Sequence, residues 1–251
     1  MTLTGHLGDI DAVLFDLDDV IVPFQTVAAW QWAWRPQGPI LGERHARAMI
    51  RRSLRAWDRR RWQGAIGKAP PADLAALRGH LAETLGAIAG HPLPPEETEA
   101  VVRRFLHPQG EVERYPDVAP ALERLRLRDV KVGVLTPLPL ESARWLLKRA
   151  GVSETLLLAS GDDPGPALPA AVAFRAAVER LGSSPARAAF VGDLFWSDVR
   201  AAHRAGLRGV LLDRPGAWSG VQGTRLGRLD SLEATLESPP PSGTDDEPEE
   251  T

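Results

Sequence analysis

Aspartate residues follow two apolar segments of the chain at spacings that could build a divalent-cation site. Asp16 and Asp18 come directly after the run IDAVLF, and Asp193 and Asp198 follow the run AAFVG. Several carboxylates brought together repel one another unless a hard cation joins them, and Mg²⁺ prefers oxygen ligands of this kind. Any one Asp at the end of a strand could instead be an N-cap or a turn residue. The DxD pair together with GDxxxxD, each behind an apolar run, favours the metal site.

A third apolar run, 130–135, ends at Thr136. In an open α/β sheet, ligands bind at the carboxyl ends of the strands, near the point where the strand order reverses. Two of these strand ends would carry Asp and a third would carry Thr. The sequence therefore predicts that Asp16, Asp193 and Thr136 share one edge of a sheet.

The elements that would position these side chains alternate between strand and helix from residue 116 onward. Short apolar runs typical of buried parallel strands occur at 10–15, 130–135, 155–159, 188–192 and 209–212. Helical patterns occur at 118–128, 139–150, 169–181 and 198–205, and each of the last three stops at a glycine. The alternation predicts an α/β fold, a three-layer Rossmann-like parallel sheet with helices on both faces.

Residues 22–115 interrupt this alternation. Beyond a short candidate flap at 21–24, the segment contains helical patterns at 26–34, 42–62, 71–89 and 95–106. We therefore expect a core formed by residues 1–21 and 116–237. The insertion at 22–115 would be an α-helical cap over the carboxyl edge of the sheet.

The charge of the chain is unevenly distributed. The net charge is −3, and the tail at 238–251 holds five acids and no bases, which leaves +2 on residues 1–237. Such a Pro-rich acidic tail cannot bury enough apolar surface to order itself, so we predict a disordered segment with a solubilising or a docking role. The chain has no Cys, no recognisable signal peptide and no apolar run near the roughly 18 residues of a membrane helix. We expect a cytoplasmic protein with no membrane partner.

The segments around Asp16, Thr136 and Asp193 resemble motifs of the haloacid dehalogenase superfamily. VLFDLDDVI looks like its nucleophile motif, VGVLT resembles its second motif, and FVGDLFWSDVRAAHRAGLRGVLLDR is similar to its acidic fourth motif and the elements that follow. The segment YPDV at 115–118 resembles the return from an α-helical cap into the core. The resemblance implies a subfamily I hydrolase with a C1 cap and a Mg²⁺ cofactor.

The resemblance also implies a role for each residue of the motifs. Asp16 would be the nucleophile that accepts the phosphoryl group. Asp18 would protonate the leaving oxygen, activate water afterwards, and offer its backbone carbonyl to the metal. Thr136 would hold a phosphate oxygen. Asp193 would bind Mg²⁺ together with Asp16, and Asp198 would support the metal through water or from the second shell.

Asp18 also separates two reactions of this superfamily. The dehalogenases that the motif resembles lack the second Asp, because a departing halide needs no proton. Its presence here favours phosphoryl transfer, so we expect a phosphatase acting through an aspartyl-phosphate on a small phosphorylated metabolite.

One part of the superfamily pattern is absent. A Lys or Arg is expected just before the helix that leads into the fourth motif, but Leu168 occupies that position and no Lys or Arg occurs from 151 to 174. Such a cation stabilises the transferring phosphoryl group, and losing one electrostatic donor costs about 10²–10³-fold in rate. A basic residue could enter from the cap or from Lys148 and Arg149. Alternatively, the protein could be a catalytically degenerate relative that binds a phosphorylated ligand or a partner protein.

The predicted cap carries a basic segment. Residues 44–61 hold eight Arg and one Asp, with Trp57 and Trp62 beside them. This pattern fits a solvated basic helix whose Trp residues pack inside the cap, and it also fits Arg side chains that bind an anionic substrate. Nucleic-acid binding is disfavoured because the segment matches no recognised module. We expect a monomer or a homodimer.

Overall fold

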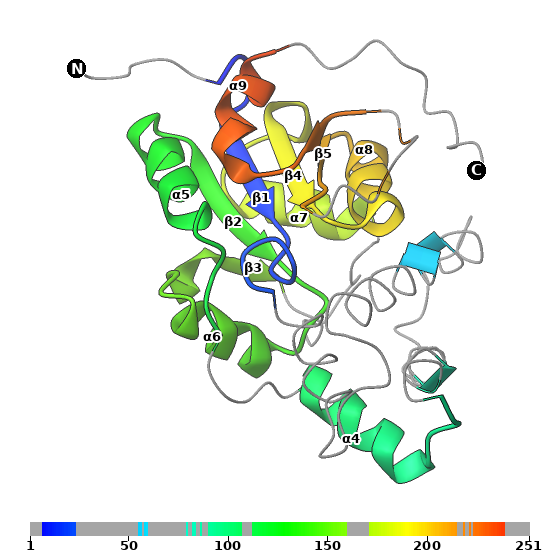
Figure 1. Ribbon diagram of the computed structural model, residues 1–251. Helices are drawn as coiled ribbons and strands as arrows, with labels where there is room; N and C mark the ends of the chain where they lie inside the picture. The colour runs from blue at the N-terminus through cyan, green and yellow to red at the C-terminus, as the bar shows by residue number, and fades with distance from the viewer. Residues whose placement is uncertain are drawn as a thin grey trace.

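The computed structural model describes residues 7–23, 55–56, 58–59, 79, 82–83, 86, 90–106, 112–159, 171–214, 218, 221 and 223–238. Within them, six strands form one parallel sheet in the order β3-β2-β1-β4-β5-β6 (Figure 1). The strands are β1 (Ala12–Phe15), β2 (Lys131–Leu135), β3 (Leu157–Ala159), β4 (Ala188–Gly192), β5 (Arg208–Leu212) and β6 (Arg225–Leu226). The strand order reverses beside β1, which lies between β2 and β4, so ligands are expected at the carboxyl ends of these central strands.

Helices cover both faces of the sheet (Figure 1). One face packs against α5 (Val118–Leu127), α6 (Leu140–Arg149) and α9 (Leu232–Glu237), and the other against α7 (Ala171–Arg180), the π-helical turn η3 (Phe195–Arg200) and α8 (Ala201–Ala205). Side chains of β1 alternate between the two cores, with Val13 and Phe15 in the first and Ala12 and Leu14 in the second. Burial on both faces explains the unbroken apolar run of this strand. The predicted three-layer α/β fold is confirmed.

The five predicted strands are present, and some of their ends differ from the prediction. The first begins at Ala12, because Ile10 instead forms an isolated bridge with Leu7. The third begins at Leu157, because the residues before it form a 3₁₀ turn in which the Ser153 hydroxyl oxygen accepts from the Thr155 backbone N–H. Strand β6 was not predicted, since two residues give no apolar run.

The predicted helices at 95–106, 118–128, 139–150, 169–181 and 198–205 correspond to observed ones. Helix α4 (Pro95–Leu106) has the predicted ends, and α5, α6 and α7 lie within the predicted ranges. The helix expected to start at Asp198 is wrong at its start, because the helical turn begins at Phe195. The backbone N–H groups of Asp198 and Val199 both donate to the Leu194 carbonyl, at 3.2 and 3.3 Å, so Asp198 lies within this turn rather than ahead of it.

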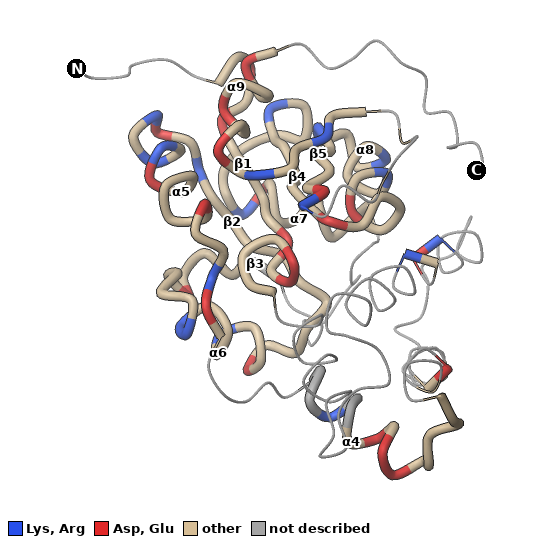
Figure 2. The backbone as a smooth tube through the Cα atoms, in the orientation of Figure 1, with Lys and Arg blue, Asp and Glu red and all other residues tan. Residues whose placement is uncertain are grey.

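The last helix is attached to the core by ion pairs. Arg124 of α5 and Arg128, directly after that helix, contact Glu233 of α9 at 2.9 and 2.8 Å, and Arg128 also contacts Glu237 at 2.6 Å. Basic positions on α5 and acidic positions on α9 are visible in Figure 2. The segment expected to be disordered lies outside the described residues from 239 onward.

Two passages connect the core with the predicted cap, and they lie side by side. The chain leaves β1 through Asp18 and Ile21, and it returns at Tyr115, whose backbone N–H donates to the Ile21 carbonyl at 3.0 Å. The expected helix at 26–34 lies outside the described residues. Those residues of 42–62 and 71–89 that the structure describes are helical, and no described helix is long and apolar enough to cross a membrane.

Candidate active site

Three neighbouring strands bring the predicted site residues to one edge of the sheet. Asp16 directly follows β1, Thr136 directly follows β2, and Asp193 directly follows β4. Phe15 is in register with Val134 on one side and with Val191 on the other, so the three strands end at nearly the same level. The backbone N–H of Asp16 donates to the Val191 carbonyl at 2.9 Å and extends the pairing to the site itself.

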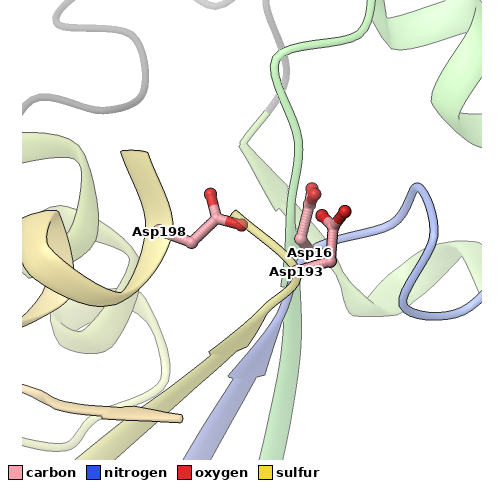
Figure 3. A group of neighbouring side chains, drawn as sticks. All are labelled: Asp16, Asp193 and Asp198. Carbon is pink, nitrogen blue, oxygen red and sulfur yellow. The ribbon is translucent and has the colours of Figure 1, made fainter. Parts of the chain in front are cut away.

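The carboxylates of Asp16, Asp193 and Asp198 converge at this edge (Figure 3). One oxygen from each lies within 4.8 Å of the others. Asp16 and Asp198 are buried and Asp193 is half-buried. Carboxylate oxygens gathered in this way are the ligands that Mg²⁺ takes in proteins, so the donor set fits this ion.

Burial and mutual repulsion disfavour negative charge in this cluster. Burial, together with the carboxylates of Asp198 and Asp18, raises the pKa of Asp16 well above its ordinary value. Burial and the neighbouring carboxylates likewise raise the pKa of Asp193 well above its ordinary value. Burial and the charge of Asp58 raise the pKa of Asp198 to about 7. A divalent cation would remove this penalty, which is the electrostatic argument for a metal here.

Hydrogen bonds from backbone N–H groups orient two of these carboxylates. Asp16 accepts from the Leu17 backbone N–H at 2.8 Å. Asp198 accepts from the Leu194 backbone N–H at 2.9 Å, which holds it against the loop that carries Asp193. Gly192 makes room for this approach, because a Cβ at that position would overlap the Asp198 side chain.

Asp18 and Thr136 are both buried beside the cluster. Asp18 accepts from the Asp19 backbone N–H at 3.1 Å, and its charge contributes to the raised pKa of Asp16. The Thr136 hydroxyl oxygen accepts from the Leu138 backbone N–H at 3.2 Å, which leaves its own proton for a ligand. The carboxylate of Asp18 is not part of the three-residue cluster. The assigned roles of both residues stay predictions.

The structure bears on one of the candidate sources of the missing cation. Leu168 lies outside the described residues. Lys148 and Arg149 are exposed in the last turn of α6, whose first turn follows Thr136. Because a helix rises about 1.5 Å per residue, they lie about 12 Å along the axis from the end nearest the site. The geometry therefore disfavours this pair as the source of the cation.

Two residues next to the cluster were missed by sequence reasoning. Asp58 of the insertion is 0% exposed, and its carboxylate accepts from the backbone N–H groups of Trp196 and Ser197 at 3.0 and 3.1 Å. Trp218 donates from its indole Nε1 to the Asp193 carbonyl at 3.0 Å. The only signal for Asp58 was its place as the single acid in the segment 44–61, which holds eight arginines.

Comparisons with known proteins bear on the family of this chain. The sequence model for haloacid dehalogenase-like hydrolases matches residues 10–206. Among curated proteins, a phosphatase from Mycobacterium tuberculosis is 33% identical over 211 residues, which cover 82% of this chain and 89% of that protein. A phosphoserine phosphatase from Thermus thermophilus is 33% identical over 126 residues, covering 48% of this chain and 49% of that protein.

Solved structures show the same fold. The L-2-haloacid dehalogenase from Xanthobacter autotrophicus is similar with a TM-score of 0.62 at 21% identity, covering 90% of this chain and 98% of that one. The putative hydrolase YfnB from Bacillus subtilis, a structure bound to magnesium, is similar with a TM-score of 0.66 at 16% identity, covering 91% and 99%. At these identities the likeness concerns the fold alone.

Proposed function

This chain belongs to the haloacid dehalogenase-like hydrolases, and we propose that it is a Mg²⁺-dependent phosphatase of a small phosphorylated metabolite. The observation that carries the proposal is the convergence of Asp16, Asp193 and Asp198 at the carboxyl edge of the sheet. The relatives that are named as phosphatases support a phosphoric monoester hydrolase.

The buried position of Asp16 at the end of β1 suits a nucleophile. One carboxylate oxygen would attack phosphorus, and the bond between phosphorus and the leaving oxygen would break, giving an aspartyl-phosphate on Asp16. Asp18 would give its proton to the leaving oxygen. It would then take a proton from the water that attacks the aspartyl-phosphate, which releases inorganic phosphate and restores Asp16.

The remaining residues would bind and orient. Asp16, Asp193 and Asp198, with the backbone carbonyl of Asp18, would hold Mg²⁺, which when bound offsets the charge of the carboxylates and of the phosphoryl oxygens. The Thr136 hydroxyl would donate to a phosphoryl oxygen, because its own oxygen already accepts from Leu138.

Some of the similar solved structures are dehalogenases, and Asp18 argues against that reaction here. A departing halide needs no proton, whereas an alkoxide leaving group does, and a buried carboxyl group two residues from the nucleophile can supply one. We expect no halide release from a 2-haloacid.

Leu168 supports a second candidate function. Without a cation before the fourth motif, the fold could bind a phosphorylated ligand or a partner protein without turnover. This candidate predicts ligand binding with no phosphate release.

Hydrolysis of p-nitrophenyl phosphate with and without Mg²⁺ separates the two functions. We expect the wild type to release phosphate only with Mg²⁺, Asp16→Asn to release none, and Asp18→Asn to be about 10²–10⁴-fold slower. A wild type that matches Asp16→Asn, while a phosphorylated ligand still binds, would establish the degenerate alternative.

A further inference from the structure

We propose that Asp58, which the insertion contributes, is a positioning residue that fixes the Asp193–Asp198 segment and so tightens the Mg²⁺ site. The inference rests on the proposed function for the identity of the ion. It makes the insertion part of the metal centre, although Asp58 itself contacts backbone groups rather than the ion.

The first observation is a two-oxygen contact between the Asp58 carboxylate and the core. Oδ2 accepts from the Trp196 backbone N–H at 3.0 Å, and Oδ1 accepts from the Ser197 backbone N–H at 3.1 Å. These N–H groups belong to the first turn of η3, where a helix leaves its N–H groups without intrahelical partners. A carboxylate that accepts two such bonds makes charge-assisted hydrogen bonds, which are stronger than neutral ones. Both donors lie between Asp193 and Asp198 in the chain.

The second observation is a contact between the Asp193 end of the segment and Arg55, which lies in the same helical part of the insertion as Asp58. Arg55 lies one turn before Asp58, and residues three apart share a helix face. Its guanidinium is 5.1 Å from the centre of the Trp218 ring, and Trp218 donates to the Asp193 carbonyl at 3.0 Å. The insertion therefore contacts the segment directly near Asp198 and through Trp218 near Asp193.

These contacts act on the backbone that carries two of the three clustered carboxylates. Asp198 accepts from the Leu194 N–H, and the N–H of Asp198 donates back to the Leu194 carbonyl. A shift of the turn at Trp196 and Ser197 would therefore move the Asp198 carboxylate relative to Asp16. Residues that orient metal ligands in this way change metal affinity or activity by about 10–100-fold when they are removed.

The test compares Asp58→Ala, Asp58→Asn and a control, Glu83→Ala, which removes an exposed carboxylate from the insertion. Mg²⁺ binding to the full chain is measured by titration calorimetry without substrate, and hydrogen exchange is measured on the peptide containing 193–200. We expect Asp58→Ala to weaken the Kd for Mg²⁺ about 10–100-fold and to speed exchange in that peptide. Asp58→Asn, which keeps one acceptor oxygen, should lie between Asp58→Ala and the wild type, and Glu83→Ala should match the wild type.

Each contrary outcome has a distinct meaning. Unchanged exchange at 193–200 in Asp58→Ala would show that Asp58 does not fix the segment, and an unchanged Kd would show that fixing it does not matter for the ion. If both Asp58 variants weaken binding while exchange at 193–200 stays at the wild-type rate, the charge of Asp58 acts and its hydrogen bonds do not, which overturns the positioning role. A wild type that binds no Mg²⁺ overturns the proposed function and the coupling together, while hydrogen exchange still tests the contact. If Asp58→Ala does not fold, as judged by circular dichroism, Asp58→Asn carries the test.

Discussion

Gly192 determines how closely the Asp198 carboxylate can approach the end of β4. A Cβ at this position would overlap the Asp198 side chain, and the glycine does not have a positive φ, so space rather than backbone freedom explains its presence. Gly192 of the pattern GDxxxxD therefore contributes to the site by leaving space for the Asp198 side chain, whereas the two acids contribute carboxylates.

Gly192→Ala should displace Asp198 and weaken the cluster. We expect the Kd for Mg²⁺ to rise about 10–100-fold, because a metal ligand is moved. Overpacking should also lower the free energy of unfolding by about 1–3 kcal/mol. Calorimetric Mg²⁺ titration and urea unfolding measure the two effects. Gly227→Ala is the matched control, since a Cβ there meets nothing within 4 Å. Wild-type Mg²⁺ affinity in Gly192→Ala would show that Asp198 does not need this approach.

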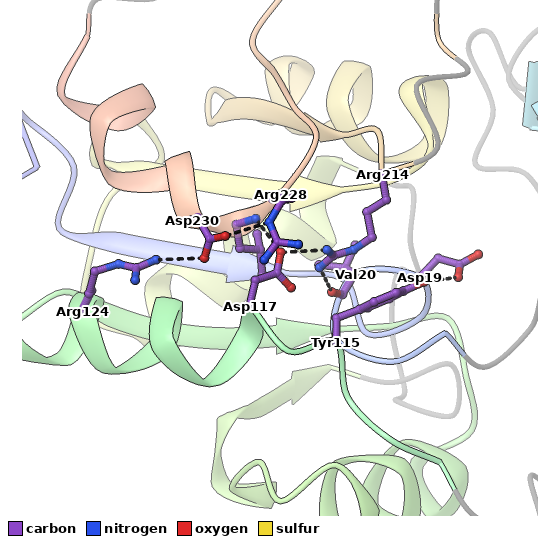
Figure 4. Close-up of polar contacts among 9 residues, drawn as sticks. Asp19, Val20, Tyr115, Asp117, Arg124, Arg214, Arg228 and Asp230 are labelled. Atoms are coloured by element: carbon purple, nitrogen blue, oxygen red, sulfur yellow. Dashed lines mark hydrogen bonds and ion pairs between the residues drawn. The ribbon is translucent and has the colours of Figure 1, made fainter.

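At the scale of elements, Arg214 joins the end of β5 to both passages of the chain between core and insertion (Figure 4). Its guanidinium donates to the Asp117 carboxylate at 2.8 Å and to the Val20 carbonyl at 2.9 Å, and it lies 3.9 Å from the centre of the Tyr115 ring. The Tyr115 hydroxyl donates to Asp19 at 3.0 Å. Asp117 is buried, and it also accepts from the Leu229 backbone N–H at 2.8 Å.

Arg214→Ala should be strongly destabilising. Removing one partner of a buried ion pair leaves the other charge uncompensated, so we expect the free energy of unfolding to fall by about 3–5 kcal/mol at pH 7. Urea unfolding followed by circular dichroism measures the loss. Arg126→Ala, which removes the Arg of an exposed pair with Glu123, should remain near the wild type. Equal stability of the two variants would mean that the Arg214 network contributes no more than a surface ion pair.

The same pair predicts a dependence on pH. Burial raises the pKa of Asp117, but the hydrogen bonds from Arg214 and Leu229 and the charge of Arg214 outweigh it, so the pKa is lowered overall. The stabilisation is therefore present above the ordinary pKa of about 3.8 and is lost as the pH falls through the lowered value. In Arg214→Ala the buried carboxylate is tolerated better once it is protonated. The difference in unfolding free energy from the wild type should thus shrink as the pH falls below the ordinary pKa value of about 3.8, and a constant difference would contradict this account.

For the molecule as a whole, the sequence predicted those features that are determined within a single segment, such as a buried strand and the residue that follows it. Buried parallel strands are apolar on both faces, so β1 and β4 appear as unbroken apolar runs, and the residue after each run identifies Asp16 and Asp193. The rule that parallel strands end at one edge then brings these residues together without any structure.

Contacts between distant segments could not be predicted in this way. Asp58 and Trp196 are separated by 138 positions, and nothing in an Arg-rich helical pattern shows which residue accepts from a particular backbone N–H. The contact between Trp218 and Asp193 could not be predicted either, because it depends on the course of the chain after β5. Sequence periodicity reports which face of an element is buried, but it does not report what that face meets.

The adjacency of the two passages allows the contribution of the insertion to be measured directly. Tyr115 bonds to Ile21 through the backbone, so a Gly/Ser linker of about six residues in place of residues 24–111 should close the core without strain. We expect this protein to fold, as judged by circular dichroism, and to bind Mg²⁺ at least as weakly as Asp58→Ala, because Asp58 and the Arg55 contact with Trp218 are lost while the three clustered carboxylates remain. Wild-type affinity would show that the insertion leaves the metal site unaffected. An unfolded product would show that the core needs the insertion for stability, contrary to the predicted division at 22–115.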